Sequence, residues 1–290
     1  MCDEFTAGDN HRHLADGISR RRFGAMAGAA GVTLALPSAA DAMPVAGRAV
    51  SVKTPDGTAD AWFVAPSSGK HPGVLMWPDI MGLRPAFQQM ARRLAESGYA
   101  VLVVNQFYRS TKAPFLAAGE SFDQPDVRAR IAPWRELLTP AATAADALAF
   151  VAFLDAQPQV DLRRGLASTG YCMGGPMAFR TAAARADRVH AVGSFHGAGL
   201  VGDAPDAPNK LIASTKADYL VAIAANDDAR APGDKDVLRA AFATAKRPAE
   251  VEVYAGAMHG WCPPDSKVYN PPQAERAWAR MLALFKTALA

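Results

Sequence analysis

The sequence lacks the features that mark three common kinds of protein. Its formal net charge is only +3, and the body of the chain has no basic cluster interleaved with aromatic residues. It therefore does not predict a partner among nucleic acids or anionic membranes. A weakly apolar run, residues 24–36, is too short to span a bilayer as a helix. Residues 43–290 contain no repeat, low-complexity tract or linker, which favours a single domain.

Cysteine is scarce, with three among 290 residues. Cys2 would be lost with an N-terminal leader, which leaves Cys172 and Cys262 in the mature chain. In an oxidising compartment two cysteines raise the question of a disulfide. A bridge between them would block any nucleophile at Cys172. We expect two free thiols.

Residues 1–42 predict a twin-arginine export signal rather than part of the fold. A Ser-Arg-Arg-Arg-Phe stretch at residues 19–23 precedes the run 24–36, and residues 40–42 supply a small-x-small cleavage pattern. Such a signal is an address for the twin-arginine export machinery, which transports folded proteins. The sequence thus predicts a periplasmic or secreted protein that keeps no membrane anchor in its mature form.

Strand-like and helix-like segments alternate along residues 43–290. Strand-like runs lie at residues 60–64, 73–78, 100–104, 166–169, 189–195, 219–224 and 251–254, and helix-like runs at residues 85–97, 141–156, 176–184 and 273–289. Such alternation predicts an α/β fold, in which helices cover both faces of a mostly parallel sheet. Residues 110–140 have no sustained period, so we expect a loop excursion over the sheet edge or over the site.

Residues 166–184 predict a nucleophile elbow centred on Cys172. A strand-like run leads into Gly-Tyr-Cys-Met-Gly-Gly at residues 170–175, and residues 176–184 are rich in helix formers. Strand, glycine-lined turn and helix form the setting of the G-x-S-x-G elbow, here with cysteine at its centre. The strained turn requires small residues two positions away on either side, and the helix start stabilises a thiolate. An isolated cysteine is more often a small buried hydrophobe, so the prediction needs a base and an acid.

His259 is the candidate base. In folds built around such an elbow, an acid and then a histidine follow the nucleophile along the chain. His259 lies in a loop of small residues after the last strand-like run. His196 also ends a strand, but no acidic residue at a strand end separates it from Cys172. The order of residues therefore favours His259.

Two adjacent carboxylates can supply the acid. Asp227 and Asp228 directly follow the apolar run 219–225, where the acid of such a site belongs. The residues themselves leave the choice open. For the oxyanion, the two backbone N–H groups expected are those of Met173, directly after the nucleophile, and of Ile80, in the loop after the run 73–78.

These motifs resemble the dienelactone hydrolase family, cysteine hydrolases of the α/β-hydrolase fold. Residues 170–175 match the family's G-x-C-x-G-G, residues 98–102 are similar to its helix-to-strand passage, and residues 259–261 resemble its His-Gly-aromatic ending. The likeness covers nearly all of residues 50–290. It implies hydrolysis of carboxylic esters or lactones, as in carboxymethylenebutenolidase, through a thioester on the cysteine.

The resemblance also implies roles for two aspartates. The family commonly places a proline four residues after its acid, and Asp228 has that spacing to Pro232 whereas Asp227 does not. It therefore favours Asp228, with Asp227 as the alternative. The family's oxyanion loop carries a glutamate that helps convert the resting cysteine to thiolate. Asp79 occupies that position here, one methylene shorter, so we expect a looser contact with Cys172.

The substrate pocket departs further from the family. The family grips a substrate carboxylate with two arginines. Arg109, in the sequence Phe-Tyr-Arg with Tyr108, matches one of them, and Trp261 follows the histidine as the family's aromatic residue. The second arginine should follow the histidine closely, but residues 259–264 contain none. The missing arginine therefore argues against dienelactone itself as the substrate.

Two other classes of function remain as alternatives. One is a non-catalytic periplasmic binding protein that has kept the fold, and the intact nucleophile, acid and histidine argue against it. The other is a metal enzyme. His259, Cys262 and Asp265 lie close in sequence, but one histidine, one cysteine flanked by prolines and a distant aspartate make a poor ligand set. The sequence predicts no cofactor and no metal; broad carboxylesterase and lactonase activity both stay open.

Overall fold

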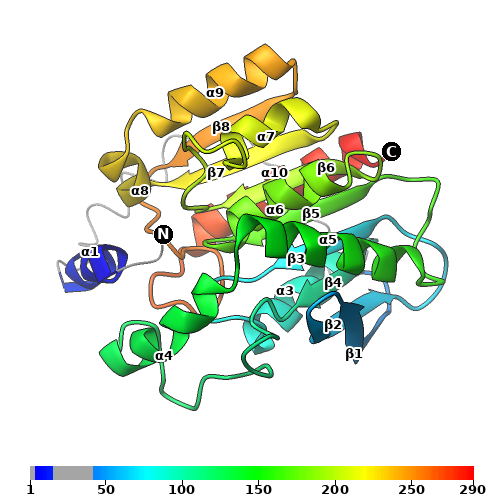
Figure 1. The fold of residues 1–290 in the computed structure, drawn as a ribbon, viewed down its shortest axis with the longest axis horizontal. Coiled ribbons are helices and arrows are strands. Elements are labelled where there is room, and N and C mark those ends of the chain that lie inside the picture. The colour runs from blue at the N-terminus through cyan, green and yellow to red at the C-terminus, as the bar shows by residue number, and fades with distance from the viewer. Residues whose placement is uncertain (1–3, 16–41) are drawn as a thin grey trace.

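The computed structural model describes residues 4–15 and 42–290. An eight-stranded sheet runs through it in the order β1-β2-β4-β3-β5-β6-β7-β8 (Figure 1). The strands are β1 (Val45–Thr54), β2 (Gly57–Pro66), β3 (Gly73–Trp77), β4 (Ala100–Val104), β5 (Leu166–Tyr171), β6 (Val189–Phe195), β7 (Asp218–Ala224) and β8 (Ala249–Tyr254).

Most of the sheet is parallel. β1 pairs with β2, and β2 with β4, in antiparallel fashion, whereas every pairing from β4 through β3 to β8 is parallel. The carboxyl ends of the parallel strands therefore meet at one edge, where α/β proteins place their sites. The predicted α/β fold with a mostly parallel sheet is confirmed.

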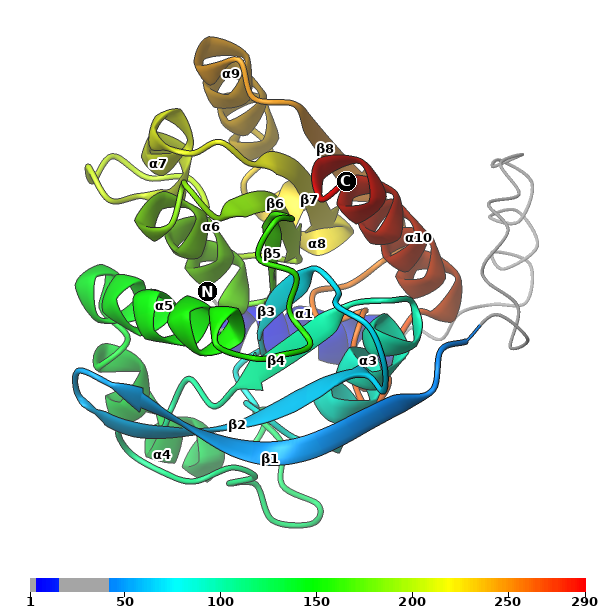
Figure 2. The ribbon, with the colours of Figure 1, turned by 90° about the vertical axis from the view of Figure 1, so that its right-hand side faces the viewer.

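Helices cover both faces of this sheet. The helices of the described residues are α1 (Glu4–Ala15), α3 (Pro85–Glu96), α4 (Pro125–Glu136), α5 (Pro140–Asp155), α6 (Gly174–Ala184), α7 (Pro208–Leu211), α8 (Ala225–Arg230), α9 (Asp234–Ala245) and α10 (Pro271–Ala288). Figure 2 shows α5, α6, α7 and α9 on one face, with α3 and α10 on the other. The parallel strands are thus buried on both sides, which explains why they are apolar throughout rather than alternating.

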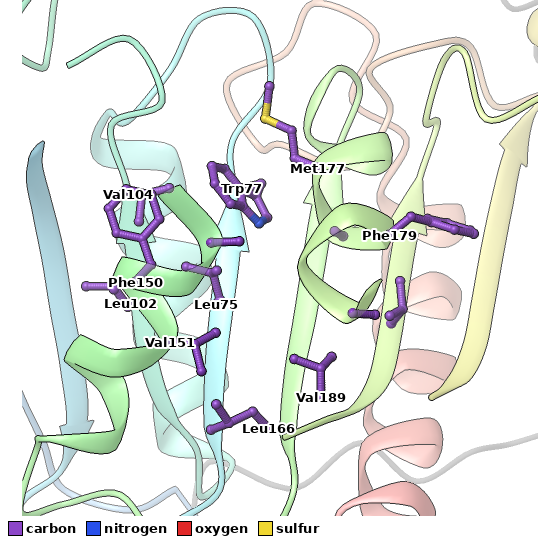
Figure 3. Packing of buried hydrophobic residues seen from close by; sticks show 14 of the residues in the cluster. Leu75, Trp77, Leu102, Val104, Phe150, Val151, Leu166, Met177, Phe179 and Val189 are labelled. Atoms are coloured by element: carbon purple, nitrogen blue, oxygen red, sulfur yellow. The ribbon is translucent and has the colours of Figure 1, made fainter. Parts of the chain in front are cut away.

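The core has a separate layer on each face. Figure 3 shows the layer that packs α5 and α6 against the sheet, with Trp77, Phe150 and Phe179 among its largest side chains. Trp77 meets Phe150 edge to face at 5.5 Å between ring centroids and donates a hydrogen bond from Nε1 to Thr181 Oγ1 at 3.0 Å. Since Trp77 ends β3, these contacts fix the start of the loop that carries Ile80.

Several helices and strands of the structure were not predicted from the sequence. β1 was not predicted because it is an edge strand with most of its residues exposed or half-buried, so no continuous apolar run marks it. The helix α9 also went unpredicted. Within the excursion at residues 110–140 the structure forms α4. The segment Glu4–Ala15, interpreted as part of a leader with no place in the fold, is the helix α1.

In the described part of the chain no single helix is long and apolar enough to cross a membrane. Only α4 and α5 taken together pass that test of length and composition, and they are bent by 79° at the break between them.

Candidate active site

Cys172 stands at the sharp turn between β5 and α6. Its backbone has φ 56, in the left-handed region that costs energy for any residue with a Cβ. Two hydrogen bonds hold this conformation: Cys172 N donates to Phe195 O at 3.0 Å, and Gly175 N donates to Cys172 O at 3.0 Å. The strained residue therefore sits at the carboxyl edge of the sheet and at the positive end of the α6 dipole, where a thiolate is stabilised.

The glycines on either side of Cys172 are required by close backbone packing. A Cβ on Gly170 would lie 1.9 Å from Gly174 O, and a Cβ on Gly174 would lie 2.4 Å from Trp77 O. No side-chain rotation relieves a clash with backbone atoms. The need for small residues two positions before and after the nucleophile, predicted from the strained turn, follows from these distances.

Gly170→Ala is expected to lower the free energy of unfolding by at least about 3 kcal/mol, because the new methyl group forces the turn apart. Urea unfolding followed by circular dichroism measures this. Gly233→Ala is the matched control, since a Cβ there meets nothing within 4 Å, and we expect a change below about 1 kcal/mol. Equal stability of the two variants would show that the elbow is not packed as described.

His259 is hydrogen-bonded to Asp227, not to Asp228. His259 Nδ1 lies 2.7 Å from Asp227 Oδ2, and the ring is 3% exposed. Asp228 instead forms an ion pair with Lys235 at 2.6 Å. The preference for Asp228 is therefore wrong as to which carboxylate contacts the histidine, and the alternative, Asp227, has the required geometry.

The local winding of the chain explains this choice. Asp227 and Asp228 lie in the first turn of α8, which begins directly after β7. Successive residues on a helix point about 100° apart, so two neighbouring carboxylates cannot both face the histidine. His259 N also donates to Asn226 Oδ1 at 2.8 Å, so the start of α8 fixes both the ring and the backbone of the candidate base.

His196 is part of the site although the sequence favoured His259 alone. It follows β6 with φ 41 and is fully buried; its ring centroid lies 5.0 Å from that of His259 and 5.1 Å from that of Trp261. Burial, reinforced by the neighbouring His259, lowers the pKa of His196 well below its ordinary value. Neither ring nitrogen has a hydrogen-bond partner among the described residues. The signal in the sequence was a polar residue at the carboxyl end of a buried strand.

The sulfur of Cys172 is held in a disulfide. Cys262 is not its partner, because Cys262 is a buried free thiol. Burial raises the pKa of the Cys262 thiol well above its ordinary value. The expectation of two free thiols is thus correct for Cys262 and wrong for Cys172 in this state. The bridge between Cys172 and Cys262 that the sequence left open does not form.

Both expected oxyanion donors lie beside Cys172. Ile80 is 5% exposed and packs in the same small apolar cluster as Cys172, with Met173 against its edge. Met173 caps the start of α6. Within the described residues, neither Ile80 N nor Met173 N donates to a backbone carbonyl. Both groups are therefore available to an oxyanion, and their use remains a prediction.

Asp79 is engaged in a buried ion-pair cluster. Arg84 Nη1 and Nη2 donate to Asp79 Oδ1 and Oδ2 at 2.6 and 3.0 Å, and Met81 N donates to Asp79 Oδ1 at 2.9 Å. Arg84 also binds Asp265 at 2.6 Å, and these carboxylates raise the pKa of the guanidinium against the effect of its burial. The observed contacts of Asp79 are those of an anchor for the oxyanion loop. No pattern in the sequence pointed to Arg84.

Two of the residues expected to hold substrate lie elsewhere. Arg109 binds Asp146 at 2.7 Å and Asp56 at 2.6 Å. The Tyr108 hydroxyl donates to Asp146 Oδ1 at 2.7 Å, and burial raises its pKa to about 12. Neither residue lines the cavity that contains Cys172. Trp261 is fully buried behind His196 and supports that ring.

Cys172, His196 and His259 open into one cavity of about 850 Å³. The excursion at residues 110–140 forms one wall of this cavity. Of the two positions predicted for it, over the sheet edge or over the site, the structure thus shows the second. The lining contains four carboxylates and two cations, and each cation is bound to a carboxylate. They are Asp79, Glu120, Asp123, Asp265, Arg84 and Lys267. Within the described residues the cavity thus offers an anion no uncommitted arginine or lysine.

Residues 4–15 and 42–290 contain no group of three or more histidine, cysteine or acidic side chains placed to hold a metal ion.

A strained nucleophile elbow, followed along the chain by an aspartate and its histidine at the carboxyl edge of this sheet, defines an α/β-hydrolase. The chain belongs to the dienelactone hydrolase family, whose model matches residues 59–289. It is accordingly a hydrolase of the dienelactone hydrolase type.

Individual relatives agree with this assignment. A protein of Escherichia coli (strain K12), provisionally named carboxymethylenebutenolidase, is 27% identical over 76% of this chain and 78% of its own length. One from Synechocystis with the same provisional name is 25% identical over 76% and 88%. A Klebsiella pneumoniae structure, provisionally called a dienelactone hydrolase, has a TM-score of 0.72 at 24% identity, over 84% of this chain and 99% of that one. That structure shares the fold.

Proposed function

We propose that the chain hydrolyses neutral carboxylic esters or lactones through a thioester formed on Cys172. The observation that supports this best is the convergence of the Cys172 elbow and the Asp227–His259 pair on one cavity. The family takes its name from a lactone, and relatives bear the name of a lactone-opening enzyme. The mechanism applies to Cys172 as a thiol, so it requires reduction of the disulfide seen here.

In the first step the Cys172 thiolate attacks the carbonyl carbon while His259 holds the proton taken from the thiol. Asp227 accepts the hydrogen bond from His259 Nδ1 and so stabilises the imidazolium. The N–H groups of Ile80 and Met173 bind the oxyanion. As the intermediate collapses, the C–O bond breaks and His259 gives its proton to the departing alkoxide. In a lactone that alcohol stays attached to the acyl group.

In the second step water hydrolyses the thioester. His259 removes a proton from the water, the resulting hydroxide adds to the carbonyl, and the C–S bond breaks to return the thiolate. Thiolate is both a strong nucleophile and a good leaving group. Against an amide it would leave the tetrahedral intermediate before the amine, so activated esters and lactones are the favoured substrates.

The charges of the cavity argue for a neutral substrate. Arg84 and Lys267 are already bound to carboxylates, and Arg109 lies outside the cavity. A substrate carboxylate would meet an excess of negative charge, which disfavours its binding. The missing second arginine, which argues against dienelactone as the substrate, agrees with this charge distribution.

A panel of paired substrates tests the proposal on dithiol-reduced protein. Each pair is a neutral ester or lactone and its analogue with one added carboxylate. We expect kcat/KM for the neutral member to be at least about tenfold higher, a difference of about 1.4 kcal/mol. A preference for the carboxylate would contradict the charge argument. Absence of turnover with every member would favour a non-catalytic binding protein.

We propose in addition that residues 1–42 are a twin-arginine leader and that the mature protein is periplasmic or secreted. The support is the order of motifs in residues 19–42, of which all but the final residue lie outside the described structure. The export machinery would then be a partner of the precursor alone.

Replacing Arg20 and Arg21 together with lysine is expected to abolish export while leaving charge and folding unchanged. Fractionation of cells that carry a functional twin-arginine system measures the export. Arg92→Lys, a change of the same kind on the exposed side of α3, is the control and should be exported normally. Periplasmic recovery of the double variant would refute the assignment.

A further inference from the structure

We propose that Gln106 is a positioning residue that holds the oxyanion donor, the N–H group of Ile80, toward Cys172. The inference rests on the proposed function, because it concerns how one backbone donor of the same site is oriented. It adds a residue from the turn after β4, which does not line the cavity that contains Cys172. Loss of this residue should slow acylation and spare the reactivity of the thiol.

Gln106 is a buried side chain fixed to one peptide group. It follows the end of β4 by two positions and is 1% exposed. Its Nε2 donates to Asp79 O at 2.7 Å. Since a carbonyl oxygen only accepts hydrogen bonds, this partner settles which end of the side-chain amide is the nitrogen. The carbonyl that Gln106 binds belongs to the peptide group whose N–H is that of Ile80.

This peptide group transmits the contact to the oxyanion donor. A peptide bond is planar and trans, so its C=O and its N–H point in opposite directions. In the sheet, β3 lies between β4 and β5 (Figure 1). Gln106 therefore approaches the loop after β3 from the β4 side, and Cys172 lies on the β5 side. A carbonyl turned toward Gln106 turns the Ile80 N–H toward Cys172.

A turn in the oxyanion loop supports the same orientation. Gly82 N donates to Asp79 O at 2.9 Å, so this oxygen accepts two hydrogen bonds. Gly82 has φ 70, a conformation in which glycine closes the turn without a clash. A flip of the peptide between Asp79 and Ile80 breaks both bonds. Gln106 thus raises the cost of the flip and keeps the donor in place before the substrate arrives.

The backbone on either side of Gln106 is itself anchored. Asn105 N donates to Asp60 O at 3.0 Å, and Asn105 Nδ2 donates to Asp60 Oδ1 at 3.0 Å. On the other side, Phe107 N donates to Asn105 Oδ1 at 3.0 Å, and Phe107 is fully buried. The side-chain nitrogen of Gln106 therefore has a rigid base from which to orient the loop.

The oxygen of the Gln106 amide speaks against a role in stability alone. Gln106 Oε1 is buried and has no hydrogen-bond partner among the described residues. An unpaired buried oxygen costs free energy of folding. Methionine, an unbranched side chain of similar size, fills such a space without that cost. A glutamine here therefore loses stability through its oxygen, and its N–H group supplies the orienting hydrogen bond.

Gln106→Met tests the inference on the dithiol-reduced protein. The variant removes the donor to Asp79 O and keeps a side chain of similar size. We expect acylation of Cys172 by p-nitrophenyl acetate to slow at least about tenfold, because a poorly oriented donor stabilises the oxyanion less. Single-turnover release of p-nitrophenolate, with the protein in excess, measures this rate. Alkylation of Cys172 by iodoacetamide forms no oxyanion, so its rate should stay within about twofold.

Gln159→Met is the matched control. Gln159 also has a buried Oε1 with no hydrogen-bond partner among the described residues, and the substitution is chemically identical. Gln159 directly precedes Val160, which forms an isolated bridge with His71 before β3 and β5 begin. It thus lies at the amino edge of the sheet, opposite Cys172. Both rates should equal those of the wild-type chain, and urea unfolding should show that both variants fold.

The outcomes separate this inference from the proposed function. Slower acylation with unchanged alkylation in Gln106→Met alone supports the positioning role. Equal acylation in Gln106→Met and Gln159→Met would overturn it. A parallel loss of acylation and alkylation in Gln106→Met would overturn it as well, because a general distortion of the elbow slows both reactions. A wild-type chain that is alkylated at Cys172 but never acylated would overturn the proposed function, and the positioning role with it.

Discussion

Cys172→Ala is expected to lower kcat/KM of the dithiol-reduced protein for an activated ester by at least about 10⁴-fold. The thiolate forms the covalent bond in the first step, and alanine cannot replace it. The side chain that remains adds no new contact, and Cys172 is only 1% exposed, so the fold should persist. Initial rates with p-nitrophenyl acetate, with circular dichroism as a check on folding, measure the effect.

Cys262→Ala is the control for this prediction. Cys262 is also a buried cysteine, but it does not line the cavity that contains Cys172. Its removal should change kcat/KM by less than about threefold and cost some stability through the small cavity left behind. If both variants kept wild-type activity, another residue would be the nucleophile.

The second large effect distinguishes two neighbouring aspartates. Asp227→Asn should lower kcat about 10³- to 10⁴-fold, because the amide no longer stabilises the imidazolium and favours the wrong tautomer of His259. Asp228→Asn should change kcat by less than about threefold, since it loses only a partly exposed ion pair with Lys235. Steady-state kinetics on the two reduced variants provides the measurement.

This pair of variants is its own control. The substitutions are chemically identical and stand one residue apart, so differences in net charge or general folding cannot explain a large ratio between them. A greater loss in Asp228→Asn would mean that Asp228 orients the histidine and that the contact of His259 with Asp227 is not the catalytic one.

The fold and the order of the catalytic residues could be predicted because both depend on local signals. The apolar strands and the glycines around Cys172 are consequences of burial and of close backbone packing, which leave direct marks in the sequence. His259 could likewise be located from its place after the last strand. The family resemblance rested on the same residues.

The choice between Asp227 and Asp228 could not be predicted from spacing, because it depends on how α8 begins. Two adjacent residues meet the same sequence criteria until the helix turns one of them toward His259. Arg109 was likewise misplaced. Its partner Asp146 lies on α5, 37 positions along the chain, and such a long-range ion pair leaves no local pattern.

The position of the helix α1 could not be predicted from the sequence either. Its composition and position suggested a leader, and nothing in residues 4–15 predicts that Asn10 contacts the loop of His259. A disulfide of Cys172 was weighed only with Cys262, which the structure shows as a free thiol. A segment that the sequence assigns to an export leader can therefore also line the cavity that contains Cys172.

The most direct test of the account is to find the acyl group on the enzyme. The reduced full chain is mixed with p-nitrophenyl acetate, quenched in acid within the first turnovers, and analysed by intact and peptide mass. We expect one acetyl group, on the peptide that contains Cys172. In Asp227→Asn this acetyl group should accumulate if hydrolysis of the thioester slows more than its formation. Turnover of the ester with no adduct at Cys172, or with the adduct on another residue, would contradict it.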